Sequence, residues 1–270
     1  GGDWVLAYPK TGYDTYGDDP QYYYLNSKGK PFLADKDNSK LGGVGFADRI
    51  DDDDAKDGDV DFSGAVGAMV NKGHTYLMNK NGVMLTGLYY LGGQVDDKGN
   101  VTEKDKVYKT KTATLDRGYY YFTEDSYPSS VAGQMVTNKR ITIDVDGDDK
   151  TYYFNKQGAA YCSTIISDYV YGVNGQLVTD AGEGNTYERV TLEKAGAAYN
   201  EETKEWELKN NKGEVVVSGT SKTEVLINEK GKIKKSGSVS KDMNEDKVEV
   251  KDYKVIKVND KDVESESDEK

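Results

Sequence analysis

Tyrosine is the residue type in this chain best suited to contact a ligand. The 22 tyrosines among 270 residues include short runs such as Tyr22–Tyr24 and Tyr119–Tyr121. An exposed tyrosine ring can stack on a sugar or on a quaternary ammonium group. Because side chains alternate across a strand, each run places its middle ring on the face opposite the other two. One face can then pack in a core while the other contacts a ligand. The alternative is that all these rings are ordinary core or half-buried strand residues.

Two acidic segments contain the residue types of a calcium site. They are residues 51–61, which begin with four aspartates, and residues 144–149. Hard cations need several clustered oxygen ligands. However, Ala55 occupies the position of the second ligand of an EF-hand loop, and Asp146-Gly147 between two strands is a hairpin signal. Both segments are therefore expected to be solvated loops or turns, with a calcium site as the alternative, and no metal-binding residue is predicted.

Other catalytic chemistry finds little support. His74 is the only histidine, which excludes a multi-histidine zinc site. Cys162 is the only cysteine, so no disulfide forms within the chain. The apolar neighbours Ile165 and Ile166 suggest that its thiol is buried and unreactive. A glycosidase needs two carboxylates held at a fixed separation in a cleft, and no segment resembles the rigid scaffold required. We therefore predict a non-enzymatic protein without a cofactor.

Composition restricts the partners and the type of core. The net charge of −12, with lysines mixed among the acids, disfavours nucleic acid and anionic membranes. No apolar run is long enough to span a membrane, so no membrane insertion is expected. Only 36% of the residues are hydrophobic and 31% are charged, which suits a thin, extended fold.

Short hairpins are the elements that must position the tyrosines. An aromatic strand, an Asn-x-x-Gly turn and a second strand recur along the chain, with the clearest copy from Tyr76 to Gly87. Asparagine and glycine favour chain reversal, and single hairpins are too unstable in water to stand alone. The sequence thus predicts an all-β, solenoid-like array of antiparallel hairpins, with at most a short helical turn at 190–198. Turns are expected at Asn26–Gly29, Asn79–Gly82, Asn155–Gly158 and Val173–Gly175.

The same repeat pattern predicts which side chains are buried and how one copy is completed. In that copy the strand Tyr119–Phe122 pairs with Gly133–Thr137 after an insertion. Matching apolar positions in the repeats predict that the following side chains are largely buried: Tyr23, Tyr76, Met84, Met135, Tyr153, Phe154 and Leu177.

Composition changes near residue 190, because only Tyr199 and Tyr253 of the 22 tyrosines lie beyond it. We predict a Tyr-rich hairpin repeat region at 1–190 and a more regular region of charged β-strands at 191–260. Residues 261–270 are rich in acids and are expected to form a flexible tail.

The Tyr76–Gly87 copy resembles the cell-wall-binding repeats of Gram-positive surface proteins, a group that includes choline- and glucan-binding modules. The copies at Tyr152 and Tyr169 are the next most similar. The resemblance implies a β-hairpin solenoid with aromatic-walled ligand sites between hairpins, in an extracellular, cell-wall-associated protein. Leu88 stands where choline-binding members carry tryptophan. The resemblance therefore implies a tyrosine-lined groove for carbohydrate rather than a choline site.

On this basis Tyr22, Tyr89 and Tyr119 are predicted to bind the ligand. Tyr22 and Tyr119 occupy the strand-opening position that carries a ligand-facing aromatic residue in the resembling family, and Tyr89 follows Leu88. The expected partner is a neutral cell-wall polysaccharide or another glycan, and a polyanion is disfavoured by the net charge. The alternative function is a structural spacer or a protein-interaction arm without a small ligand.

Overall fold

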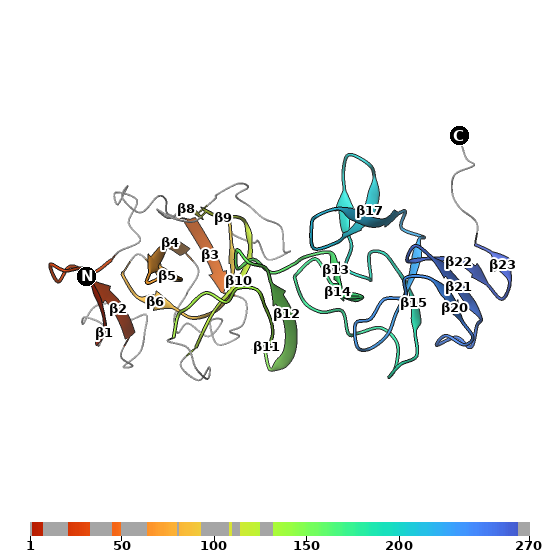
Figure 1. Ribbon diagram of the computed structural model, residues 1–270, viewed down its shortest axis with the longest axis horizontal. Helices are drawn as coiled ribbons and strands as arrows, with labels where there is room; N and C mark the ends of the chain where they lie inside the picture. Colours follow the sequence, from red (N-terminus) through yellow and green to blue (C-terminus); the bar gives the residue numbers. More distant parts are fainter. Residues whose placement is uncertain are drawn as a thin grey trace. The chain divides into compact units, whose positions relative to one another are not determined.

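The computed structural model describes residues 2–7, 21–32, 45–49, 64–79, 81–92, 108–109, 114–124 and 132–263. Within these ranges the chain consists of β-strands, turns and extended segments, with no helix (Figure 1). Among the described strands, the pairs are antiparallel except for one contact between β13 (Thr164–Ile166) and β17 (Glu205–Lys209). The prediction of an all-β chain built from antiparallel hairpins is confirmed. That the hairpins continue as one solenoid along the chain stays a prediction.

Two compact units divide the chain. The first unit contains residues 1–149 and 154–160, and the second contains residues 150–153 and 161–270. Strand β12 (Asp148–Phe154) contributes residues to both. The compositional boundary at residue 190 lies inside the second unit and stays a prediction.

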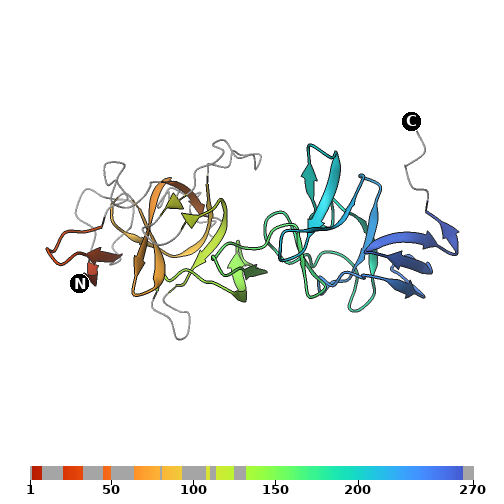
Figure 2. The same ribbon diagram turned by 45° about the horizontal axis from the view of Figure 1, so that its top comes forward.

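The first unit contains a six-stranded sheet in the order β10-β7-β3-β4-β5-β6 and two smaller strand pairs, β1-β2 and β8-β9 (Figures 1 and 2). Strand β11 also belongs to this unit and pairs with β12. The strands are β1 (Asp3–Ala7), β2 (Gln21–Leu25), β3 (Gly45–Arg49), β4 (Gly64–Asn71), β5 (His74–Asn79), β6 (Met84–Leu85), β7 (Gly87–Leu91), β8 (Tyr108–Lys109), β9 (Thr114–Leu115), β10 (Gly118–Phe122) and β11 (Lys139–Val145).

The second unit contains three sheets. Strands β16, β17 and β18 are paired in sequence and join the β13-β14 hairpin through β17; β15 pairs with β19; and β20 to β23 form a four-stranded meander. Apart from β13 and β17, the strands are β14 (Tyr169–Tyr171), β15 (Glu188–Thr191), β16 (Ala198–Asn200), β18 (Val215–Gly219), β19 (Glu224–Ile227), β20 (Gly237–Val239), β21 (Val248–Lys251), β22 (Lys254–Val258) and β23 (Lys261–Asp262).

The predicted turns are confirmed, and so is the pairing of the interrupted repeat. The backbone N–H of the closing glycine donates to the carbonyl of the opening residue at Asn26–Gly29, Asn79–Gly82 and Asn155–Gly158, and Gly175 donates to Gly172 in the same way. Met135 forms a bridge with Phe122. The region 190–198 holds a hydrogen-bonded turn between β15 and β16, in which the N–H of Ala195 donates to the carbonyl of Thr191.

One side-chain arrangement recurs in the turns of both units. The side-chain oxygen of the opening residue accepts the backbone N–H groups two and four positions later, which holds the reversal in place. The opening residues that share this geometry are Asn26, Asn79, Asn155, Asn210, Asn228 and Asp242. The turn opened by Asp242 closes on Glu245 instead of glycine, at φ 66°. The repeat therefore continues through the charged C-terminal region.

The turn at Asn228 provides a stability test. Its side chain is buried and accepts the N–H groups of Lys230 and Lys232, both at 3.1 Å. We expect Asn228→Ala to lower the free energy of unfolding by about 1–3 kcal/mol, because the substitution leaves these donors without their acceptor. Asn26→Ala, in the same turn geometry at an exposed position, is the control and should cost less. Equal losses in chemical denaturation of the two variants would contradict this account.

Tyrosines form much of the core, but not always the predicted ones. Tyr76, Met84 and Phe154 are buried as expected. Tyr23, Met135, Tyr153 and Leu177 were also expected to be largely buried, and they are partly exposed, so they are less buried than the first three. Besides Phe154, the largest fully buried rings are those of Tyr89, Tyr120, Tyr152, Tyr171 and Phe122.

Candidate functional site

Tyr89 lies in the core of the first unit. Its side chain is 0% exposed and packs in a cluster with Leu91, Tyr120 and Phe122. Strand β7 pairs with β10 so that Tyr89 lies directly opposite Tyr120. The idea that Tyr89 is part of an exposed aromatic surface is therefore corrected: its ring fills the core face of the six-stranded sheet.

Tyr119 and Tyr90 form the accessible aromatic pair of the same two strands. They are directly opposite one another in the register of β10 and β7, on the face opposite Tyr89 and Tyr120. Both side chains are half-buried, and their ring centroids are 4.9 Å apart in an edge-to-face arrangement. Each of the two side chains therefore keeps part of its surface exposed. Tyr90 was missed because Tyr89, its neighbour, was chosen from the same Tyr-Tyr sequence.

Tyr22 belongs to a different sheet of the first unit. It lies in β2 opposite Leu6 and is half-buried against a cluster that contains Met69, Tyr76 and Met84. Trp4 of β1 packs nearby, with its ring centroid 4.7 Å from that of Tyr76. Tyr22 and Tyr119 therefore lie in two different sheets of the first unit, and both are half-buried. No contact between them defines a common groove in the described residues.

Of the two acidic segments, the structure describes only residues 144–149. Residues 51–61 lie outside the described residues. At 144–149 the chain forms the β11-β12 hairpin turn, in which the N–H of Gly147 donates to the Asp144 carboxylate at 2.9 Å. In the part of the chain that is described, no three His, Cys, Asp or Glu side chains are grouped to hold a metal ion.

The single histidine and the single cysteine occupy ordinary positions in strands and connections. His74 is exposed at the first position of β5, directly after the β4-β5 turn. Cys162 is half-buried, and burial raises the pKa of its thiol to about 12. The thiol is therefore protonated at neutral pH, which makes it a poor nucleophile.

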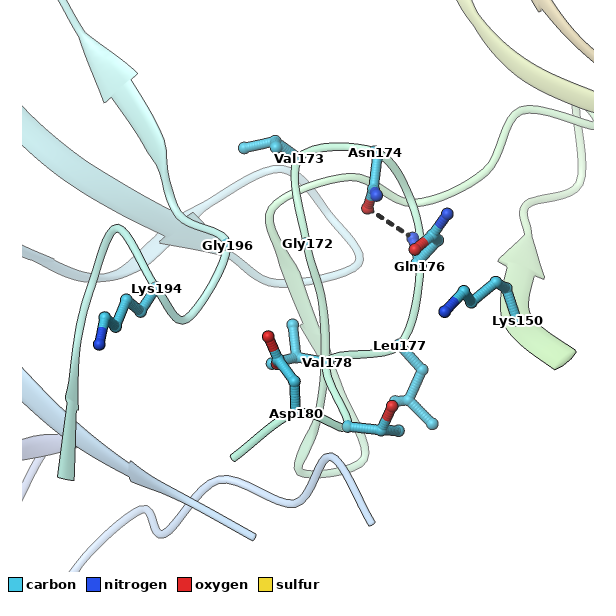
Figure 3. Close-up of a pocket in the computed structure, with 11 residues that line it drawn as sticks. Lys150, Gly172, Val173, Asn174, Gln176, Leu177, Val178, Asp180, Lys194 and Gly196 are labelled. Atoms are coloured by element: carbon cyan, nitrogen blue, oxygen red, sulfur yellow. Dashed lines mark hydrogen bonds between the residues drawn. The ribbon is translucent and has the colours of Figure 1, made fainter. Parts of the chain in front are cut away.

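A polar cavity of about 270 Å³ lies in the second unit, beside the segment 172–180 (Figure 3). Its charged lining residues are Lys150, Asp180 and Lys194, and the N–H of Gln176 donates to the Asn174 side chain at 3.1 Å. Figure 3 shows the two lysines on opposite sides of this segment. No aromatic side chain lines the cavity, so it differs from the aromatic-walled site implied by the family resemblance.

The wall of this cavity depends on two glycines. Gly196 has φ 77°, and a Cβ atom on it would overlap the Cα of Gly172. The hydroxyl of Ser163 donates to the Gly196 carbonyl at 2.9 Å. The turn around Gly196 is thereby held against Gly172. With Asp180 as its single carboxylate, this cavity does not provide the pair of acids that glycoside cleavage needs.

Within the described part of the chain, no helix has the length and apolar character needed to cross a membrane. No protein-family model and no curated protein sequence matches the chain.

Several solved structures show a weak similarity to this chain. The choline-binding domain of CbpL from Streptococcus pneumoniae is 15% identical, with a TM-score of 0.27 over 70% of this chain and 75% of that one. The autolysin LytC from Streptococcus pneumoniae, in complex with a synthetic peptidoglycan ligand, is 10% identical, with a TM-score of 0.22 over 96% of this chain and 48% of that one. Choline binding protein F of the same organism is 16% identical, with a TM-score of 0.17 over 98% and 83%. This chain thus spans about half the length of the autolysin. At these low scores and identities, none of the three establishes a family or a ligand for this chain.

Proposed function

We propose that the chain is a non-enzymatic, cell-wall-associated extracellular module that binds a neutral wall polysaccharide or another glycan. The observation that carries this proposal is the half-buried pair Tyr90 and Tyr119, held edge-to-face at 4.9 Å on the accessible side of β7 and β10. Aromatic rings offer a rigid, apolar surface with a polar hydroxyl tip, which suits the faces and hydroxyl groups of a sugar.

Tyr22 supplies a second contact in this proposal. Each sugar–ring contact is weak, and one polymer that engages both positions gains affinity because its second contact is intramolecular. In the resembling family, choline-binding members carry tryptophan at the position that Leu88 occupies here. Choline is therefore an unsuitable ligand in this proposal. Tyr89 has no direct role, since its ring is buried.

The test is a co-sedimentation assay with insoluble cell-wall polysaccharide. We expect the double variant Tyr22→Ala, Tyr119→Ala to bind about tenfold more weakly than the parent, because contacts at both positions are lost. Tyr22→Phe, Tyr119→Phe keeps both rings and should retain most of the binding. The control Tyr199→Ala removes a ring from the second unit that is 43% exposed, and it should bind like the parent. Folding of each variant is checked by circular dichroism.

A structural spacer is the second candidate function, and a specific observation favours it. Several bulky aromatic side chains of the repeats are used inside the protein, since Tyr76, Tyr89, Tyr120, Tyr152 and Tyr171 are buried. If the alanine double variant sediments as well as the parent while folded, Tyr22 and Tyr119 serve packing only. The spacer function then becomes the better account of the chain.

A further inference from the structure

Arg117 lies beside the aromatic pair Tyr90 and Tyr119. In the antiparallel register of β10 and β7, Tyr119 is opposite Tyr90, and the pairing extends to the first residue of β10. Arg117 directly precedes β10, and Gly92 directly follows β7. Continuation of the same register therefore places Arg117 next to Gly92, at the end of the two strands where the tyrosine pair lies.

The side chain of Arg117 fills the space that Gly92 leaves open. A Cβ atom on Gly92 would lie only 2.5 Å from the Cγ atom and 2.8 Å from the Cβ atom of Arg117. Leu91, the residue before Gly92, is buried in the core of the first unit. Because successive side chains alternate across a strand, the Cβ direction at Gly92 is that of Tyr90. The contact with Gly92 therefore puts the stem of Arg117 on the face of Tyr90 and Tyr119.

Gly118, between Arg117 and Tyr119, supports the same placement independently. A Cβ atom on Gly118 would be in ordinary contact with the Ala159 side chain at 3.8 Å and with the ring of Tyr120 at 3.9 Å. Tyr120 belongs to the buried cluster of the first unit, and Ala159 packs against that cluster. Position 118 thus faces the core, so Arg117 and Tyr119 share the opposite face, about 7 Å apart along the strand.

The backbone at Arg117 is held in place while its side chain is exposed. The hydroxyl of Tyr120 donates to the carbonyl of Asp116 at 2.9 Å, which ties the preceding residue to a core ring. The side chain of Arg117 is exposed, and none of the salt bridges between described residues involves it. A guanidinium group carries five N–H donors and no acceptor. These donors are available to the oxygen atoms of a ligand.

We propose that Arg117 is a binding residue of the tyrosine site, where its guanidinium group donates hydrogen bonds to two neighbouring oxygen atoms of a neutral sugar. This inference rests on the proposed glycan function. The planar fork of donors fits a pair of adjacent acceptors, and the rings of Tyr90 and Tyr119 contact the apolar surface of the sugar. Asp116, exposed next to Arg117, and the net charge of −12 disfavour a polyanionic ligand at this position.

The test uses the full chain and co-sedimentation with insoluble cell-wall polysaccharide. We expect Arg117→Ala to bind about tenfold more weakly than the parent, because hydrogen bonds from a charged donor are lost. Arg117→Lys keeps the charge but not the fork, and it should recover only a small part of the affinity. The control Arg140→Ala removes an exposed arginine from β11, which pairs with β12 and not with β7 or β10, and it should bind like the parent.

Three results would overturn the role of Arg117. The first is parental affinity of Arg117→Ala. The second is full recovery in Arg117→Lys, which would show that charge alone matters. The third is a strong loss of parental binding between low salt and about 1 M salt, because a hydrogen bond to a neutral sugar is little affected by screening whereas attraction to an acidic polymer is weakened.

The tyrosine variant separates failure of this inference from failure of the proposed function. If Tyr22→Ala, Tyr119→Ala binds weakly and Arg117→Ala binds like the parent, the tyrosine site stands and the role of Arg117 is wrong. If the tyrosine variant itself binds like the parent, the glycan site is wrong, and the role of Arg117 within it fails as well. Circular dichroism and the urea midpoint of each variant check that the exposed substitution leaves the fold intact.

Discussion

Truncation of Tyr152 to alanine will lower the free energy of unfolding of the second unit by about 3–5 kcal/mol. The side chain of Tyr152 is 0% exposed, and its hydroxyl accepts a hydrogen bond from Gln176 Nε2 at 3.0 Å. The substitution therefore creates a cavity and removes a partly buried hydrogen bond. Both effects destabilise the folded state, and neighbouring strands can collapse only partly into the space.

Tyr153→Ala is the matched control for this prediction. Tyr153 lies on the other face of β12 and is half-buried. Its ring centroid is 5.7 Å from that of Tyr161 and 6.2 Å from that of Tyr171. Its loss should cost about 1–2 kcal/mol, because less area is removed from water on folding. Urea denaturation followed by the fluorescence of Trp206 reports on the second unit, in a Trp4→Phe background that silences the first. A larger loss for Tyr153 than for Tyr152 would show that burial is assigned to the wrong face of the strand.

Replacement of Arg189 by methionine will cost about 3–5 kcal/mol of stability in the second unit. The Nε atom of Arg189 donates to Asp242 at 2.7 Å, and its terminal nitrogen donates to Asp246 at 2.6 Å. The side chain of Asp242 is 0% exposed. Removal of the guanidinium group leaves a buried carboxylate without its cation, which costs much more than the loss of an exposed ion pair.

Two further variants separate this effect from general loss of charge. Lys204→Met breaks the pair with Glu201, whose side chains are 66% and 80% exposed, and should cost less than about 1 kcal/mol. Adding Asp242→Asn to Arg189→Met should restore more than half of the lost stability. The amide oxygen can still accept the N–H groups of the turn, as Asn228 does in its own copy of the same geometry. No recovery in this double variant would mean that Arg189 acts mainly through packing.

The local chemistry of the chain was enough to predict its Asn-x-x-Gly turns and its tyrosine-rich strands. Tyrosine-rich and β-branched runs favour strands, and Asn-x-x-Gly reverses the chain wherever it occurs, since the asparagine side chain satisfies two backbone donors inside a five-residue segment. Turns at Asn26, Asn79 and Asn155 needed nothing from elsewhere in the protein. The single cysteine and the net charge likewise follow from counting alone.

Which face of each strand is buried was decided by the tertiary structure. Alternation divides Tyr89 from Tyr90, and Tyr152 from Tyr153, but it does not say which member faces the core. Tyr89 was predicted to be exposed and is buried, and Tyr152 is more deeply buried than the predicted Tyr153, because burial depends on which other strands cover each face.

Contacts between residues far apart in sequence were also decided only by the tertiary structure. Arg189 meets Asp242 across 53 positions. Lys235 comes to lie against Tyr253 because the turn between β21 and β22 bonds to its carbonyl. The net charge of −12 describes the average of the chain, and on that average a polyanionic ligand is disfavoured. The electrostatic field at any one surface depends on how folding arranges nearby charges rather than on this average, because charges are screened beyond about 10 Å in salt.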